Sequence, residues 1–423
     1  MNRFIPAAVF IVIAFLLLIL RSCAPETTEP EAILTGAERL IEQDFGVMDG
    51  MRVGVITHQS AVAGEHHLAE VLHEAENVEL AALFTAGYGM CGDTEAGNRI
   101  TNDIDEFAGV PVYSLNSEVP APASDMLEGI DALVFDIQDT GTSSFASIST
   151  LGLTMQAAAR HDIRFVVLDR INPFGGERVE GFIPEPGFGS FVGLYPIPAI
   201  HGMTMGELAL MIRSEALLEN IAQVDLHVVE VRGWTRDRLW SDTGLEWIPP
   251  GPDFPDFESA LAYAGACYLE AAGISGGRAT SKPFLQVGAP WADGKTIADK
   301  LNSRNLPGLR FESASFIPES IEGMVTDPKW RGEELQGVQY IVEEPSEVEP
   351  VAAAMHLIEV FYSQAPEQER EALLDKVRFG RLAGTDRMFD LLAKGASAEE
   401  VIAAWKEDVD AFRRLRSLYM IYD

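Results

Sequence analysis

Acidic, basic and amide side chains directly follow several short apolar segments of this sequence, and together they could carry acid–base chemistry on a small ligand. These candidates are His58, Asp136, Asp139, Asp169, Arg170 and Asn172. A carboxyl group can give or take a proton, and an arginine can bind an anion. His201, in a Pro-Ala-Ile-His-Gly-Met-Thr segment, is a further candidate. A structural role is the alternative for each of them, because Asp and Asn after a strand often cap a helix or form a turn.

The elements that must position these residues follow an alternating pattern. Apolar segments typical of buried strands alternate with segments of helical periodicity. Strands are expected over 51–57, 78–84, 131–135, 163–168 and 226–231, and helices over 32–42, 66–74, 145–160 and 204–218. This order predicts a Rossmann-like, doubly wound parallel sheet in an N-terminal domain, 32–249. Ligands bind at the carboxyl ends of such strands, so the candidates are expected to meet in one cleft.

A second, smaller α/β domain is expected over 250–423, because the composition changes at Pro249-Pro250-Gly251-Pro252. Helices are expected over 258–272, 351–363, 387–393 and 398–421, and strands over 311–316 and 338–342. The segment Ser275–Trp291 is predicted to close one side of the cleft, which would add Arg278 and Trp291 to the site. Trp291 could stack on a sugar, although packing in the core is the commoner role of tryptophan.

The composition excludes several classes of function. The chain has 423 residues, which suits two domains, with 65 acidic and 31 basic residues and a net charge of −34. Such a charge repels phosphate backbones, so no nucleic-acid partner is expected. Three cysteines cannot form a disulfide framework, although Cys91 and Cys267 could pair in an oxidising compartment.

The N-terminus has the pattern of a targeting segment. Arg3 precedes an apolar run from Ala7 to Leu20, which is short for a membrane span and suits a secretory signal peptide over 1–22. Leu20-Arg21-Ser22-Cys23 is similar to a bacterial lipoprotein cleavage site, so lipidation of Cys23 and a tether over 23–31 are expected. The alternatives are an uncleaved anchor or a plain signal peptide. All of these predict an exported protein, and the favoured one is a membrane-attached periplasmic or cell-surface lipoprotein.

Two short patterns are misleading. Gly87–Gly92 matches G-x-G-x-x-G after a strand, but no helical pattern follows, as a dinucleotide site requires. Gly273–Gly277 matches G-x-S-x-G, but a helix precedes it and no strand does, contrary to a nucleophile elbow. The histidines lack the spacing of a zinc site. No cofactor and no metal are therefore expected, and an oxidoreductase is the weakest alternative.

The segments VFDIQDTG (134–141), VVLDRINPFGG (166–176), IPAIHGMTMGELA (197–209), GLEWIPPGPDFP (244–255) and KPFLQVGAPW (282–291) occur in this order. Together they resemble the bacterial exo-β-N-acetylmuramidase family, long known only as a domain of unknown function. The resemblance runs from about Ala37 to the end of the chain. It implies a Rossmann-like domain, a smaller domain and a cleft between them. It also implies an exported enzyme that removes terminal N-acetylmuramic acid from peptidoglycan fragments.

Two acidic positions of the family motifs are not acidic in this chain. The family's Ser-Pro-Glu-His-Gly corresponds to Thr-Ala-Gly-Tyr-Gly at 85–89, and its Ser-Glu-Gly-Arg-Gly corresponds to Ser-Gly-Gly-Arg-Ala at 275–279. Gly87 and Gly276 therefore stand where the family carries Glu. Glycoside hydrolysis usually needs two carboxyl groups beside the scissile bond, so the loss of both bears directly on activity.

Two hypotheses follow. In the first, hydrolysis persists on other carboxyl groups, with Asp139 or Glu95 as general acid/base and Asp136 as a positioning group. The substrate-binding residues would then be His58, Asp93, Asp169, Arg170, Asn172, His201, Arg278 and Trp291. In the second, the chain is a non-catalytic lipoprotein that binds muropeptides. Two carboxyl groups facing each other across the cleft favour the first hypothesis, and one or none favours the second.

Overall fold

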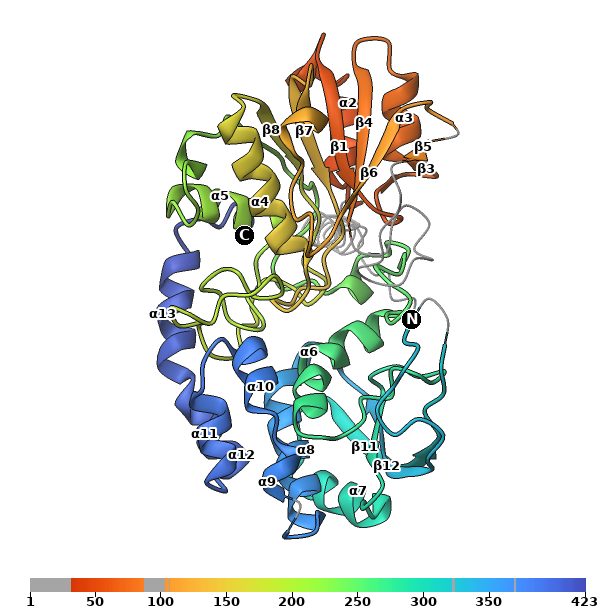
Figure 1. The fold of residues 1–423 in the computed structure, drawn as a ribbon, viewed down its shortest axis with the longest axis vertical. Helices are drawn as coiled ribbons and strands as arrows, with labels where there is room; N and C mark the ends of the chain where they lie inside the picture. Colours follow the sequence, from red (N-terminus) through yellow and green to blue (C-terminus); the bar gives the residue numbers. More distant parts are fainter. Residues whose placement is uncertain (1–31, 87–102, 106, 322–323, 369) are drawn as a thin grey trace, which may run out of the picture. The chain divides into compact units, whose positions relative to one another are not determined.

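A seven-stranded sheet forms the centre of the N-terminal half of the protein in the computed structural model (Figure 1). The structure describes residues 32–86, 103–105, 107–321, 324–368 and 370–423. The strand order is β5-β6-β4-β1-β7-β8-β9, and all neighbours pair in parallel except β5 with β6. The strands are β1 Arg52–Thr57, β4 Glu79–Ala86, β5 Asp103–Ile104, β6 Pro111–Leu115, β7 Ala132–Asp136, β8 Arg164–Leu168 and β9 Leu226–Val229. The predicted Rossmann-like α/β architecture is confirmed.

Helices cover both faces of this sheet because its strands carry apolar side chains on both sides. In β1, Val53 and Val55 belong to the core beneath α2 (Gly36–Glu42) and α3 (Leu68–Glu74), whereas Ile56 belongs to the core on the other face. That second core includes α4 (Ser147–Arg160) and α5 (Met205–Ser214). Burial of nearly every strand residue explains why these segments read as continuous apolar runs.

Two predicted helices differ in the structure. The segment expected to be helical over 66–74 begins with a strand, β3 His66–His67, which pairs with β2 Val62–Ala63, so the helix starts only at Leu68. The segment 398–421 is not one helix: α12 ends at Ala404 and α13 spans Lys406–Arg416. Trp405, between them, is buried and packs edge-on against Phe182, with ring centroids 5.7 Å apart. This contact accounts for a break that helical periodicity did not show.

The C-terminal half combines helices with a small antiparallel sheet, in agreement with the predicted smaller α/β domain (Figure 1). Its sheet has the order β10-β12-β11, formed by Gln286–Ala289, Leu335–Val342 and Leu309–Phe316 respectively. Its helices are α6 Phe257–Ala271, α7 Gly294–Asn302, α8 Pro350–Gln364, α9 Arg370–Leu373, α10 Lys376–Ala383, α11 Arg387–Ala393, α12 Ala398–Ala404 and α13. The strand β10 and the helices α7 and α10 were not predicted, although Asp293 and Asp375 cap the starts of the two helices and Gly384 ends α10. No helix within the described residues is long and apolar enough to cross a membrane.

Candidate functional site

A cavity of about 390 Å³ lies at the carboxyl ends of the central strands. Four strands contribute to its wall through His58 after β1, Ala86 of β4, Leu115 of β6 and Ile137 after β7. Residues from farther along the chain complete it: Asn116, Ser117, Ser144, Phe145, Ala146, Ser147, Thr150, Phe191, Val192, Pro250, Tyr263 and Arg278. The strand ends therefore do form a ligand-sized cavity, and the C-terminal half contributes Tyr263 and Arg278 to it.

Asp139 is buried immediately behind this cavity. Ser147, at the start of α4, lines the cavity and donates a hydrogen bond to Oδ2 of Asp139. The backbone N–H of Gly141 donates to Oδ1 at 2.6 Å. Burial raises the pKa of Asp139 to about 7, although its hydrogen bonds oppose the rise. Asp139 can therefore hold a proton near neutral pH, and the hydroxyl of Ser147 connects it to the cavity.

His58 lines the same cavity as a neutral imidazole. Its Nδ1 accepts a hydrogen bond from the backbone N–H of Ser60 at 3.2 Å, which places the ring proton on Nε2. Nε2 then donates to the carbonyl oxygen of Gln138 at 3.3 Å. Burial, together with the positive charge of Arg170, lowers the pKa of His58 to about 4. His58 can accordingly shape the cavity but is not charged at neutral pH.

Asp136 and Arg170 form a buried ion pair at the ends of β7 and β8. The guanidinium of Arg170 donates from Nε to Oδ1 of Asp136 at 2.5 Å and from Nη2 to Oδ2 at 2.9 Å. Arg170 also lines a neighbouring cavity of about 380 Å³, together with Ser60, Gln138 and Trp240. Asp136 lines neither cavity, and both of its carboxylate oxygens are occupied by Arg170.

Asp169 anchors the N-terminus of α5 and the end of the chain. It accepts hydrogen bonds from the backbone N–H of Gly206 at 2.7 Å, from the hydroxyl of Thr204 at 2.7 Å and from the hydroxyl of Tyr422 at 2.6 Å. Burial raises its pKa to about 6, and these hydrogen bonds oppose the rise. Asp169 is not among the residues that line the two cavities at the strand ends.

Asn172 and His201 also make local contacts away from these cavities. The side chain of Asn172 donates to the carbonyl of Met203 at 3.0 Å and accepts from the backbone N–H of Phe174 at 2.9 Å. Nδ1 of His201 accepts from the backbone N–H of Met203 at 3.2 Å. Burial lowers the pKa of His201 to about 3, so its ring is neutral. Both residues fix the turn that leads into α5.

Of the two residues predicted from the C-terminal half, the structure brings only Arg278 to the cavity. Its guanidinium pairs with the buried carboxylate of Asp253 at 2.5 Å. Trp291 packs instead against Trp330, with ring centroids 6.0 Å apart, and does not line the cavity. The cavity that both halves of the protein line therefore includes Arg278, as predicted, but it does not include Trp291.

Several predicted residues lie outside the described part of the chain. They are Cys23, Gly87, Cys91, Asp93 and Glu95. Cys267 is described and is a buried free thiol. Within the described residues, no carboxyl-bearing side chain lines the cavity at the strand ends.

Sequence reasoning missed Ser147 and Tyr263. The hydroxyl of Ser144 donates to that of Tyr263 at 3.4 Å, which connects the segment before α4 to helix α6 across the cavity wall. A serine in the first turn of a helix is too common to single out. Tyr263 lies in a helix that is apolar on most sides, so its periodicity gave no sign of a binding face.

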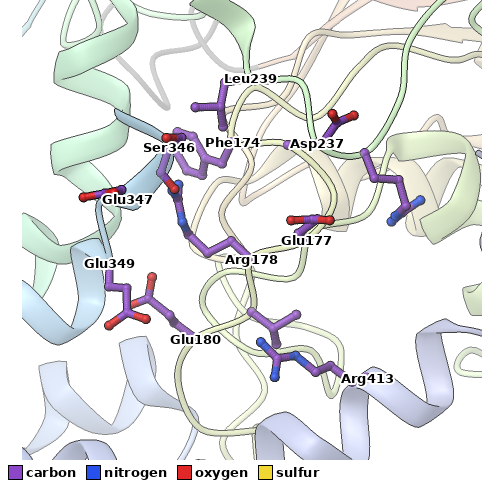
Figure 2. A pocket seen from close by; sticks show the side chains of 13 residues that line it. Phe174, Glu177, Arg178, Glu180, Asp237, Leu239, Ser346, Glu347, Glu349 and Arg413 are labelled. Carbon is purple, nitrogen blue, oxygen red and sulfur yellow. The ribbon is translucent and has the colours of Figure 1, made fainter. Parts of the chain in front are cut away.

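A third cavity, of about 270 Å³, lies between the segment 174–180 and the start of α8 (Figure 2). Oε2 of Glu180 accepts the backbone N–H groups of Val351 and Ala352, both at 3.0 Å, and Arg178 donates to the carbonyl of Ser346 at 2.9 Å. Burial raises the pKa of Glu180 to about 8. These contacts cap α8 and join the two halves of the protein.

His356, Glu359 and Glu399 are the only His, Cys, Asp and Glu side chains in the described residues that are grouped closely enough to hold a metal ion. The guanidinium of Arg304 already bonds there, to Nδ1 of His356 at 2.8 Å and to both oxygens of Glu359 at 2.9 and 3.1 Å. Arg304 thus supplies the positive charge that a metal ion would bring.

Comparison with known proteins identifies the family. Residues 53–258 match the family model "Exo-beta-N-acetylmuramidase NamZ, N-terminal", and residues 261–422 match the corresponding C-terminal model. The chain belongs to the NamZ family. It is 36% identical over 398 residues to the peptidoglycan beta-N-acetylmuramidase NamZ of Bacillus subtilis (strain 168), which covers 94% of this chain and 93% of the relative. The resemblance of the sequence motifs to the exo-β-N-acetylmuramidases is thereby confirmed.

Two solved structures share the fold. Both are crystal structures of DUF1343 family proteins from Bacteroides fragilis. One matches with a TM-score of 0.84 and 36% identity, covering 92% of this chain and 99% of its own. The other matches with a TM-score of 0.76 and 27% identity, covering 93% and 99%. The arrangement of both halves of this NamZ-family chain therefore recurs in experimental structures.

Proposed function

We propose that this protein is a cell-wall glycosidase that takes the terminal N-acetylmuramic acid of a peptidoglycan fragment into the cavity at the strand ends. The Bacillus subtilis relative is named for this class of activity, and it aligns over 94% of the chain. The observation that supports this proposal most directly is that Ser147 lines the cavity and also donates a hydrogen bond to Asp139. A carboxyl group with a pKa of about 7 is half protonated near neutral pH, which suits a general acid.

Hydrolysis breaks the glycosidic C–O bond and adds the elements of water across it. The leaving oxygen needs a proton, which Asp139 would supply through the hydroxyl of Ser147. The second carboxyl group needed for glycoside hydrolysis stays a prediction from the sequence. Glu95 is its candidate, with Asp93 close by, because both follow Ala86, a residue of the cavity wall, by fewer than ten positions.

A second candidate function is muropeptide binding without catalysis. One observation favours it: no described residue that lines the cavity carries a carboxyl group. The positions of the two family acids are Gly87 and Gly276 in this chain. A protein of this kind would keep the cavity, including His58, Tyr263 and Arg278, and would bind the sugar without turning it over.

Turnover and binding measured on one substrate separate these functions. The substrate is a disaccharide in which N-acetylmuramic acid is β-linked to a second sugar, with release of free N-acetylmuramic acid as the readout, because a sugar leaving group departs only when it is protonated. We expect turnover by the wild type and a loss of about 10²-fold or more in kcat for Asp139→Asn. Asp131→Asn, an exposed carboxylate before β7, is the matched control and should leave kcat unchanged.

Three outcomes are decisive. Binding without turnover in the wild type would contradict hydrolysis and support the non-catalytic function. Turnover that survives in Asp139→Asn would exclude Asp139 as the acid. The absence of both binding and turnover would refute the proposed ligand.

We further propose that the protein is exported and held at a membrane by lipid on Cys23. The support is the sequence alone: the apolar run from Ala7 to Leu20 and the segment Leu20-Arg21-Ser22-Cys23. Intact-mass analysis of membrane-extracted protein should give a chain that starts at a lipidated Cys23, and Cys23→Ala should release it. Retention of Met1, or a free N-terminus at another residue, would contradict the proposal.

A further inference from the structure

The cavity between the segment 174–180 and the start of α8 is lined by two charged side chains that each leave one polar atom without a partner (Figure 2). These atoms are Nη1 of Arg178 and Oε1 of Glu180, and neither has a hydrogen-bond partner among the described residues. Glu180 is only 5% exposed, so water does not replace the missing partner at low cost. One atom is a donor and the other an acceptor, so the cavity lacks a group of each kind.

The remaining atoms of these two side chains are already bonded, which fixes both groups in place. Oε2 of Glu180 accepts the backbone N–H groups of Val351 and Ala352, and Nη2 of Arg178 donates to the carbonyl of Ser346. Each side chain also acts on the pKa of the other through its charge, although the two form no hydrogen bond. A bound molecule that accepts from Nη1 and donates to Oε1 would complete both.

The charges around the cavity favour a ligand that carries both signs. The acidic residues that line it are Glu177, Glu180, Asp237, Glu347 and Glu349, and the basic ones are Arg178, Arg236 and Arg413. Arg236 is already paired with the buried Glu207 at 2.6 Å. A simple anion would meet a majority of carboxylates, and a simple cation would leave Nη1 of Arg178 without a partner.

The size and the apolar part of the cavity restrict the ligand further. Its volume is about 270 Å³, just below the range of about 300 to 1,000 Å³ typical of sites for drug-sized molecules. Phe174 and Leu239 lie at one end of it in Figure 2, and the carboxyl groups of Glu180 and Glu349 lie side by side at the other. A small molecule with a polar end and a short apolar part matches this arrangement.

We propose that this cavity binds a free α-amino acid with a small side chain, its ammonium at Oε1 of Glu180 and its carboxylate at Nη1 of Arg178. The site shares no lining residue with the cavity at the strand ends, and the inference does not depend on the proposed function. The bound amino acid would bridge the segment 174–180 and the start of α8. Binding should therefore strengthen the contact between the two halves of the protein and raise its melting temperature.

Binding of the ammonium should also release a proton from Glu180. Burial raises the pKa of Glu180 to about 8; the negative charge of Glu349 adds to the rise, and the positive charge of Arg178 opposes it. A further ionisable neighbour, Tyr268, is neutral because burial raises its pKa. Glu180 is therefore mostly protonated at pH 7, whereas an ammonium beside it favours the carboxylate. The affinity should consequently increase between pH 6 and pH 8, with release of about one proton at pH 7.

Isothermal titration and thermal unfolding of the wild type with four probes test this site. The probes are L-alanine, D-alanine, ethylammonium chloride and sodium acetate, so each of the last two carries only one of the two charges. The better-bound enantiomer of alanine should bind at least about tenfold more tightly than either single-charge probe, which is the scale of one charge-assisted hydrogen bond. Titrations at pH 7 in buffers with different ionisation enthalpies measure the released proton.

Three variants locate the site. Glu180→Gln can still accept from the N–H groups of α8 but presents an amide donor in place of Oε1, so it should lose about tenfold in alanine affinity and all of the proton release. Arg178→Met should remove the preference for alanine over ethylammonium. Glu333→Gln, on an exposed glutamate that does not line this cavity, is the matched control and should behave as the wild type.

The result that supports the inference is tighter binding of alanine with proton release, both lost in Glu180→Gln. Equal affinity of the wild type for alanine and ethylammonium would show a site for cations alone and would overturn it. Unchanged alanine binding in Glu180→Gln would place the ligand elsewhere and would also overturn it, as would no binding of either enantiomer.

Discussion

Replacing Asp139 by Asn should change how the stability of the protein depends on pH. Burial raises the pKa of Asp139 from 3.8 to about 7. Between these values the native state holds a proton that the unfolded state has released, so the wild type loses stability as the pH rises. Since a tenfold change in proton affinity is worth about 1.4 kcal/mol, the loss is about 4 kcal/mol for this fully buried group. Asn cannot titrate and avoids that loss.

Urea unfolding at pH values from 4.5 to 8.5, followed by tryptophan fluorescence, measures the effect. The free energy of unfolding of Asp139→Asn minus that of the wild type should rise by several kcal/mol across this range. Any constant offset from altered hydrogen bonds to Gly141 and Ser147 leaves the slope unchanged. A difference that stays flat for Asp139→Asn would mean that Asp139 is ionised throughout, and the proton-holding role would be refuted.

Two further predictions concern packing and the buried ion pair. Arg170→Met leaves Asp136 buried without its partner and should lower the free energy of unfolding by about 3 to 5 kcal/mol. Arg170→Met with Asp136→Leu should recover much of this loss, and an unchanged stability of the single variant would contradict the reasoning. Gly265→Ala would place a Cβ 2.0 Å from the carbonyl oxygen of Pro350, so α6 and α8 must separate. The free energy of unfolding, measured by thermal denaturation, should fall by about 1 to 3 kcal/mol. An unchanged stability would contradict this close approach of the two helices.

The order of strands and helices in the N-terminal half was readable from the sequence because each element there has a strong local pattern. The β1, β7 and β8 segments are buried on both faces, and the capping box of Thr204 and Glu207 marks the start of α5. The C-terminal elements were harder to predict. The break at Trp405 depends on a contact with Phe182, more than two hundred residues away in the chain.

The candidate site was predicted only in part, for a physical reason. A residue after a strand is known to lie at one edge of the sheet, but its partners come from distant segments. Asp169 is engaged by Thr204 and Tyr422, and Arg170 is engaged by Asp136. Asp169 directly follows its strand and Asp139 follows the end of its strand by three residues, but this position does not reveal which of them anchors a helix and which lies beside the cavity. Only the tertiary contacts separate the two roles.

The position of a bound sugar is the most direct test of the proposed function. A crystal structure of the wild type soaked with N-acetylmuramic acid should show the sugar in the cavity at the strand ends, within contact of Ser147, Tyr263 and Arg278. The sugar should lie against the hydroxyl of Ser147, which separates it from the buried Asp139 and can pass a proton between them. Occupancy of the neighbouring cavity beside Arg170 and Trp240, with the first cavity empty, would contradict the assignment of the site.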